Sequence, residues 1–226
     1  GGRDPDRRRL SAGDATAATH AANERFSQWL NIENAQDDDE ARRGFIARPS
    51  GTITNAAGAV LIDFDAFSFV EGAAPQTVNP SLWRHAVLNA RIGLFRVTDG
   101  IYQLRGFDLA NMTLIEGKTG WIVVDALTCR ETAQAALRFA RKHLGEKPVS
   151  AIIFTHSHID HFGGALGVMS SEEAALRKIP VIAPEGFMAE AVSENILVGV
   201  AMGRRANYQF GMTLERSARG MVDTGL

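Results

Sequence analysis

Residues 154–164 read Phe-Thr-His-Ser-His-Ile-Asp-His-Phe-Gly-Gly, and they place three histidines and a carboxylate within six positions. The apolar run Ala151–Phe154 leads into them, and Pro148 precedes that run. A short apolar run of this kind predicts a buried strand, and the pattern from Gly164 onward predicts a helix. The polar stretch is therefore expected to be the loop at the end of a core strand, the edge where open α/β sheets bind ligands.

The polar side chains of this loop have the chemistry of metal ligands, because imidazoles and carboxylates bind zinc and similar ions. His156 and His158 are two residues apart and can reach one ion from a tight turn. The adjacent Asp160 and His161 can reach a second ion, and two ions about 3.5–4 Å apart can activate water for hydrolysis. The alternative is a polar loop whose histidines cap a helix, but three histidines and an aspartate at this spacing favour the metal site.

The stretch resembles the signature of the metallo-β-lactamase superfamily, Thr-His-x-His-x-Asp-His, which would begin here at Thr155. The resemblance implies two zinc ions, with His156 and His158 on one ion and Asp160 and His161 on the other. It also implies that Asp160 is catalytic, as a metal ligand that can accept a proton. Members of the superfamily hydrolyse lactams, thioesters, phosphodiesters and sulfate esters, so this signature alone leaves the substrate open.

Other segments are similar to the alkylsulfatases of this superfamily. They are residues 79–84 (NPSLWR), 111–117 (NMTLIEG), 121–125 (WIVVD) and 203–211 (GRRANYQFG). The resemblance runs from about Asp14 to the last residue, and Ala126 stands where a proline is expected. It implies an enzyme that hydrolyses alkyl sulfate esters, such as dodecyl sulfate, to an alcohol and inorganic sulfate. It further implies a homodimer of the full-length protein and a periplasmic or secreted location. The alternatives are another hydrolase of the superfamily, acting on a lactam or thioester, and an inactive metal-binding fragment.

Length and composition set outer limits on these expectations. The chain has 226 residues, of which 45% are hydrophobic and 22% charged, as is usual for a soluble globular protein of one or two domains. A net charge of −2 gives no electrostatic case for binding nucleic acid or an anionic membrane. No apolar run approaches the roughly 18 residues of a transmembrane helix. The single cysteine, Cys129, excludes an intrachain disulfide.

The fold class predicted is α/β, with residues 1–92 as a helical N-terminal extension and residues 93–226 as the first half of an αββα metallo-β-lactamase sandwich. Within the extension, residues 1–10 read as a disordered lead and residues 14–30 as a helix. Asp37–Glu40 reads as an acidic turn. Asn79-Pro80 is a cap followed by a proline, which predicts the start of another helix.

The catalytic region is predicted to open with two β-hairpins. One turns at Asp99-Gly100, a sequence typical of a type I′ turn, and the other turns at residues 117–120. Asp125 ends the second hairpin, and it either orients a metal ligand or has a helix-cap or loop role. A helix follows from Cys129, with Thr128 and Glu131 as its capping box.

After the metal loop we expect a helix to about Lys178, a short strand at 181–183 and an apolar helix from Glu185 to about Val200. Residues 204–211 carry two adjacent arginines and are either an anion-binding wall or a solvated turn.

The sequence lacks part of the ligand set that the resemblance implies. No histidine follows His161, although such sites take ligands from later strands, which in the alkylsulfatases are two glutamates and a histidine. The later glutamates follow no pattern that identifies them as these ligands. From Leu94 onward there are only about 130 residues, against roughly 200 for a complete domain of this type. We therefore expect a fragment that alone binds zinc weakly, associates and hydrolyses nothing, with the remaining ligands lying beyond Leu226.

Overall fold

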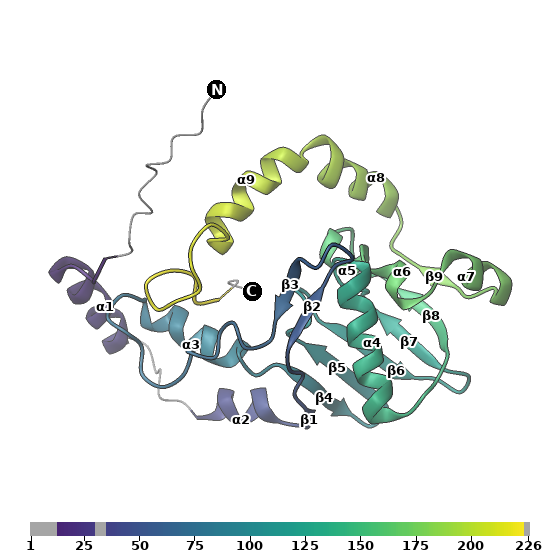
Figure 1. Cartoon of the computed structure of the whole chain (residues 1–226), viewed down its shortest axis with the longest axis horizontal. Helices are drawn as coiled ribbons and strands as arrows, with labels where there is room; N and C mark the ends of the chain where they lie inside the picture. The colour runs from purple at the N-terminus through teal and green to yellow at the C-terminus, as the bar shows by residue number, and fades with distance from the viewer. Residues whose placement is uncertain (1–12, 30–34, 224–226) are drawn as a thin grey trace.

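The structure, a computed structural model, describes residues 13–29 and 35–223 (Figure 1). The predictions for residues 1–10 and for a helix end at Leu30 lie outside these ranges. Seven strands between residues 45 and 182 form one sheet of order β1-β4-β5-β6-β7-β8-β9. Its strands are β1 (Phe45–Ala47), β4 (Gly93–Thr98), β5 (Ile101–Arg105), β6 (Met112–Glu116), β7 (Trp121–Val124), β8 (Val149–Ile153) and β9 (Val181–Ile182).

The sheet changes from antiparallel to parallel pairing at β7. Strands β1 and β4 to β7 pair antiparallel, whereas β8 runs parallel to both β7 and β9. A parallel pair needs a crossover connection, and helix α4 (Arg130–Leu144) supplies it between β7 and β8. The carboxyl ends of β7 and β8 therefore lie side by side, and the loops that leave them meet at one edge of the sheet.

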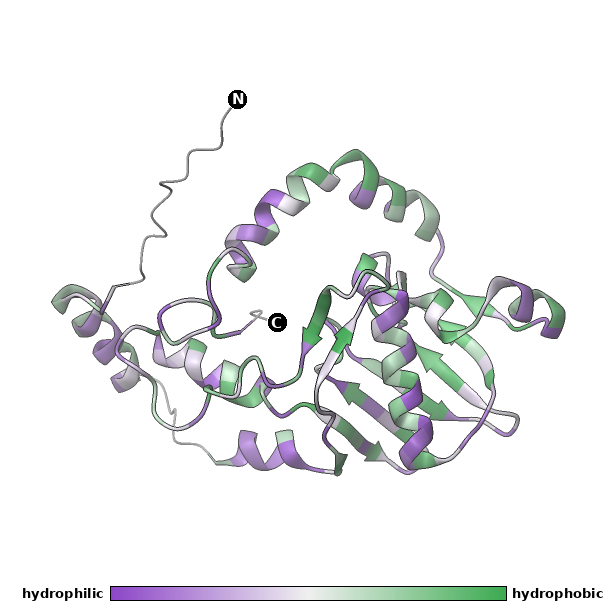
Figure 2. Ribbon diagram, in the orientation of Figure 1, coloured by the Kyte–Doolittle hydropathy of each residue, from purple (hydrophilic) through white to green (hydrophobic). Residues whose placement is uncertain are grey.

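The core lies between this sheet and α4. Period-two alternation gives the sheet its inner face, since Leu104, Met112, Leu114 and Val123 are fully buried and stand opposite one another in the register. On α4 the buried residues recur at helical spacing, at Ala133, Ala136, Leu137 and Ala140. Figure 1 shows α4 lying across one face of the strands, and Figure 2 shows hydrophobic residues in the strands and on α4 beside polar ones.

The extension contains helices as predicted, and it contains strands, one of which matches the strand that the sequence predicts at residues 60–64. Its helices are α1 (Ala17–Trp29), α2 (Gln36–Arg42) and α3 (Pro80–Asn89), and its strands are β1 and the hairpin of β2 (Thr52–Thr54) with β3 (Val60–Asp63). The predicted cap of α3 is confirmed, because Asn79 Oδ1 accepts a hydrogen bond from the Ser81 amide. The boundary at residue 92 stays a prediction, since β1 pairs with β4 across it.

Two of the predicted turns are wrong in detail. The acidic residues Asp37–Glu40 lie in helix α2 and not in a turn, where Asp38 accepts hydrogen bonds from Arg42 and Arg91 that offset its charge. The Asp99-Gly100 hairpin forms, but only Gly100 has a positive φ (74°), so the turn is not type I′. A bulge between Arg96 and Thr98 on β4 accompanies this different turn.

The predicted capping box of α4 does not form. The helix begins at Arg130 with Cys129 as its N-cap residue, and no side chain caps it. The Thr128 hydroxyl instead donates to Asp108 Oδ1 at 2.6 Å, because the loop after β5 brings that carboxylate against the start of the helix.

The two helices predicted after the metal loop are each broken. The first consists of α6 (Ala165–Val168) and α7 (Ser171–Arg177), and Ser170 caps α7 by accepting a hydrogen bond from the Glu173 amide. A further short helix, α5 (Ile159–Phe162), lies within the stretch that the sequence predicts to be a loop. The second consists of α8 (Phe187–Val192), a π-helix η1 (Ser193–Leu197) and α9 (Gly199–Phe210). The predicted solvated turn at residues 204–211 therefore falls mostly inside α9.

The α8–η1–α9 segment forms an arm that rises from the sheet and returns toward α3 (Figure 1). Several large apolar side chains of the arm are exposed, among them Met188, Ile196, Leu197 and Val200. In the part of the chain that the structure describes, no helix combines the length and apolar character needed to cross a membrane.

Candidate metal centre

The predicted metal loop lies at the carboxyl end of β8. Ile153 ends that strand, and the Thr155 amide donates to Asp125 Oδ1 at 2.8 Å, which ties the start of the loop to the end of β7. His158 is the N-cap residue of α5, so Asp160 and the adjacent His161 both lie within that short helix. The strand-to-loop-to-helix order is the one that the sequence predicts.

The four predicted ligand residues come together in space. The ring centroids of His156 and His158 are 4.5 Å apart, and those of His156 and His161 are 3.9 Å apart. His161 Nε2 lies 3.3 Å from Asp160 Oδ2. His158 is the most open of the group, with 55% of its side chain exposed, whereas Asp160 is 15% exposed. How these residues divide between two ions stays a prediction.

Asp125 orients this cluster from behind. Its carboxylate is buried, and Oδ2 lies 2.7 Å from His161 Nδ1. The same carboxylate accepts hydrogen bonds from the Thr155 amide and the Thr155 hydroxyl. The backbone at Asp125 has a φ of 60°, a left-handed conformation that Asp and Asn adopt more readily than most residues. Asp125 is expected from the sequence either to orient a metal ligand or to have a helix-cap or loop role. The geometry favours the first, because its carboxylate orients His161.

Each of the three loop histidines has a ring nitrogen engaged by an oxygen outside the predicted ligand set, while His161 Nε2 faces Asp160, itself a predicted ligand. Thr155 Oγ1 lies 2.9 Å from His156 Nδ1, Asp125 engages His161 Nδ1, and Glu194 Oε1 lies 3.1 Å from His158 Nε2. A metal-ligating histidine usually donates its other ring N–H to such a partner, which fixes the tautomer. This arrangement leaves His156 Nε2, His161 Nε2 and His158 Nδ1 as the nitrogens for an ion.

The electrostatics at His156 favour neutral imidazole, the form that binds metals. Partial burial lowers the pKa of His156 from its ordinary value of 6.5, and the neighbouring His161 and His158 lower it further. Within the described residues no three histidine, cysteine, aspartate or glutamate side chains are already arranged around one point. The donor set nevertheless fits metal ions, because its imidazoles are crowded together and each has a ring nitrogen held by a protein oxygen.

Glycines allow the loop to pack against the segment that follows β7. The Gly164 amide donates to the Leu127 carbonyl at 2.8 Å, and the Ala126 amide donates to the His161 carbonyl at 2.7 Å. A Cβ atom at Gly164 would lie 2.1 Å from the Ala126 oxygen, so only glycine permits this approach. These backbone contacts fix the position of His161.

Sequence reasoning missed three supporting residues of the site. Thr155 was recognised only as part of the motif, and its hydroxyl bridges Asp125 and His156. Glu194 follows no ligand pattern, and it reaches His158 only because of the course of the arm. Asp108 supports the loop between β7 and α4, where it accepts from the Thr128 amide at 3.0 Å. A Thr directly before the first histidine is the one signal in the sequence that marks any of them.

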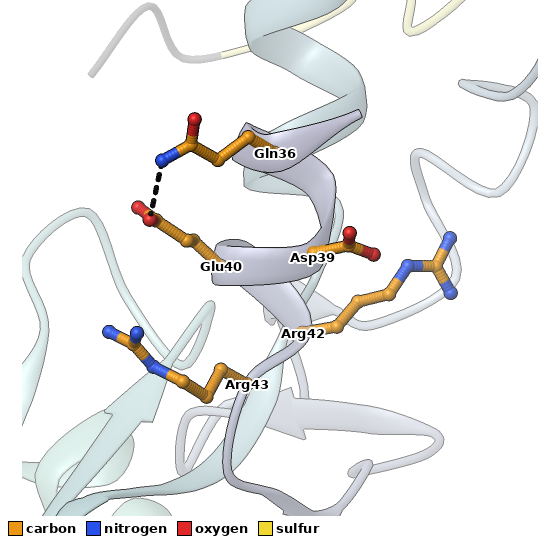
Figure 3. Close-up of a pocket in the computed structure, with 5 residues that line it drawn as sticks. All are labelled: Gln36, Asp39, Glu40, Arg42 and Arg43. Atoms are coloured by element: carbon orange, nitrogen blue, oxygen red, sulfur yellow. Dashed lines mark hydrogen bonds between the residues drawn. The ribbon is translucent and has the colours of Figure 1, made fainter. Parts of the chain in front are cut away.

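Two of the open hollows on the described surface differ in their relation to the cluster. One surrounds α2 and is lined by Gln36, Asp39, Glu40, Arg42 and Arg43 (Figure 3). It lies at the far side of the sheet from α5 (Figure 1), so we assign it no role in catalysis. The other adjoins the metal loop and is mostly apolar, being lined by Phe154, Val181, Ala183, Pro184 and residues 186–189. In it Phe154 stacks on Phe187 with ring centroids 5.6 Å apart.

Comparison with known proteins agrees with this geometry. The profile described as the metallo-beta-lactamase superfamily matches residues 105–217, half of the chain, including the whole metal loop. The chain belongs to this superfamily. Membership implies that the protein binds metal ions, and the mixed sheet with its helices is the fold that the sequence predicts.

Within the superfamily the chain is similar to alkylsulfatases. It is 47% identical over 218 residues to an (R)-specific secondary-alkylsulfatase of a Pseudomonas species, covering 96% of this chain and 33% of that protein. It is 43% identical to an alkyl/aryl-sulfatase of Saccharomyces cerevisiae, covering 95% of this chain and 34% of that protein. A solved structure of a stereoselective inverting sec-alkylsulfatase from Pseudomonas superposes with a TM-score of 0.90, at 47% identity, over 96% of this chain and 34% of that one. The chain thus spans about a third of the length of these relatives.

Proposed function

We propose that the whole protein hydrolyses alkyl sulfate esters, such as dodecyl sulfate, to an alcohol and inorganic sulfate. The observation that carries this proposal is the cluster of His156, His158, Asp160 and His161 at the end of β8, in a chain 47% identical to an alkylsulfatase over 96% of its length. We also propose two zinc ions as the cofactor, with His156 and His158 on one and Asp160 and His161 on the other. Bound metal ions supply Lewis-acid activation of water and offset the charge that develops on the ester.

The chain's own groups hold and orient this chemistry. Asp125 keeps the His161 Nδ1 proton in place, so that Nε2 faces the site together with Asp160 Oδ2. The Thr155 hydroxyl donates to Asp125 and lies beside His156 Nδ1. Asp160 is the group that we assign to accept a proton, at Oδ2, because its carboxylate is mostly buried next to the histidines.

We assign the alkyl chain of the substrate to the apolar surface beside the loop. The hollow lined by Phe154, Val181 and Phe187 begins one residue before Thr155, and α8 continues its apolar wall at Met188. A ligand site that combines an apolar wall with a few polar groups fits a substrate with a hydrocarbon tail and an anionic head.

The direct test is release of inorganic sulfate from dodecyl sulfate by the whole protein with zinc present. A panel with a lactam and a thioester separates this activity from other activities of the superfamily. The proposal expects sulfate release and its loss in His156→Ala. Turnover of a lactam or thioester, without any release of sulfate from the ester, would reject it.

A further inference from the structure

The arm between β9 and the C-terminal region carries one acidic side chain into the metal centre. Glu194 lies in the π-helix η1, and its side chain is 23% exposed, whereas the nearby Ile196 and Leu197 are 72% and 76% exposed. Its Oε1 atom lies 3.1 Å from His158 Nε2. Of the two glutamates in the arm's helices, Glu190 is exposed and Glu194 turns inward, toward a histidine of the metal loop.

The π-helix explains how the side chain reaches that position. The Val198 amide donates to the Ser193 carbonyl at 3.0 Å, the wide i to i+5 pairing that interrupts the α-helical course between α8 and α9. Single π turns inside α-helices occur frequently at functional sites, because they shift the direction of side chains relative to a regular helix. Here the turn aims Glu194 at His158.

The contact completes a pattern that the other two histidines already show. His156 and His161 each have their Nδ1 engaged, by Thr155 and Asp125, and so offer Nε2 to an ion. Glu194 engages the opposite nitrogen of His158. A carboxylate that accepts a hydrogen bond from Nε2–H would fix the tautomer whose lone pair is on Nδ1. It would also raise the basicity of Nδ1.

We propose that Glu194 is a positioning residue of the metal centre, which holds the His158 Nε2–H group and so presents Nδ1 as the ligand. The inference rests on the proposed metal-dependent function and adds a role for the arm, since it makes the arm part of the site's support. The contact with His158 is through one oxygen of Glu194, Oε1, so a glutamine can accept the same hydrogen bond through its carbonyl oxygen. A direct metal ligand would not tolerate that exchange, because the amide is a much poorer ligand than the carboxylate.

The test measures the zinc affinity of the 226-residue chain by competition with a chromophoric chelator. The proteins compared are the wild type, Glu194→Ala, Glu194→Gln and the control Glu190→Gln. Glu190 is exposed on α8 of the same arm. We expect Glu194→Ala to weaken zinc binding about 10–100-fold, Glu194→Gln to weaken it a few-fold at most, and the control to leave it unchanged. Unchanged affinity in Glu194→Ala would overturn the inference, and so would an equal loss in Glu194→Gln and Glu194→Ala, which would indicate a direct ligand.

A second measurement works without metal and separates this inference from the proposed function. Long-range proton–nitrogen NMR of the metal-free chain reports which ring nitrogen of each histidine carries the proton. We expect His158 to carry it on Nε2 in the wild type and to lose that preference in Glu194→Ala. A proton fixed on Nδ1 of His158 would overturn the inference. If the wild type shows the expected tautomer but binds no zinc, the proposed metal function fails while the Glu194 contact stands.

Discussion

At the scale of single residues, the site depends on oxygen atoms that hold histidines in one orientation. Asp125 uses both carboxylate oxygens at once, with Oδ1 accepting from the Thr155 amide and Oδ2 facing His161 Nδ1. An amide in its place would turn an NH₂ group toward one of these donors. Asp125 therefore differs from Glu194, whose contact uses a single oxygen.

We predict that Asp125→Asn weakens zinc binding about 10–100-fold, as loss of an orienting partner does in other metal sites. The fold should persist, because asparagine tolerates the left-handed backbone at this position. The matched control is Asp99→Asn in the exposed β4–β5 turn, which should bind zinc like the wild type. Zinc titration with circular dichroism on both variants checks this, and equal affinity in Asp125→Asn and the control would contradict the assigned role.

The lowered pKa of His156 predicts how stability of the metal-free chain depends on pH. Below the ordinary value of 6.5 the unfolded chain takes up a proton at this residue, while the folded chain does not until its lower pKa is reached. Stability should therefore fall as the pH drops through that window and be regained as the pH rises above 6.5. Urea unfolding at a series of pH values should show a shallower dependence in His156→Gln. Identical pH profiles in the two proteins would show that His156 has no such shift.

At the scale of elements, the close approach of α6 to the segment after β7 keeps the metal loop in place. A Cβ atom at Gly164 would meet the carbonyl oxygens of Ala126 and Cys129, which belong to the backbone and cannot rotate away. The amide of the same residue donates to Leu127. The loop and the start of α4 are thus held as one unit.

We predict that Gly164→Ala lowers the free energy of unfolding by about 1–3 kcal/mol, the usual cost of overpacking, and also weakens zinc binding. Gly203→Ala is the matched control, because a Cβ atom there meets nothing within 4 Å. That change should stabilise α9 by about 0.5–1 kcal/mol through helix propensity. Denaturant unfolding of both variants is the measurement, and a Gly164→Ala protein as stable as the wild type would refute the packing argument.

Elements with a strong local pattern could be predicted from the sequence. The apolar run before Thr155 gives β8, the spacing of Ala133, Ala136 and Ala140 gives α4, and Asn79-Pro80 gives the start of α3. The breaks after Val168 and Val192 could not be predicted. At the first, the Ser170 side chain accepts a hydrogen bond from the Glu173 amide, and at the second the Val198 amide pairs with the Ser193 carbonyl, which a helical pattern does not contain. The predicted capping box at Thr128 is absent for a similar reason, because the Thr128 hydroxyl donates a hydrogen bond to Asp108 instead.

At the scale of the whole molecule, the arm leaves apolar side chains exposed that a stable monomer would usually cover. Figure 2 shows hydrophobic residues along α8, and Met188, Leu197 and Val200 are each more than 70% exposed. Exposed apolar surface of this kind promotes association. The four residues predicted as ligands could be picked out from the sequence alone because all of them lie in one loop.

We predict that the 226-residue chain associates in solution and that Leu197→Glu reduces this association. Leu197 lies in η1, and 76% of it is exposed, so a charge there costs little in the folded monomer. Leu176→Glu on α7 is the control, because that residue is 85% exposed but lies away from the arm. Light scattering over a range of concentrations checks the prediction, which fails if the wild type is monomeric throughout.

The central claim is that the loop from His156 to His161 is the metal centre of a hydrolase. The most direct test is the metal content and dodecyl sulfate turnover of the whole protein, as wild type and as Asp160→Ala. We predict about two zinc ions per wild-type chain, and the loss of one ion and nearly all turnover in the variant, because a two-metal site needs both ions to activate water. Unchanged zinc content and normal sulfate release in Asp160→Ala would contradict the claim.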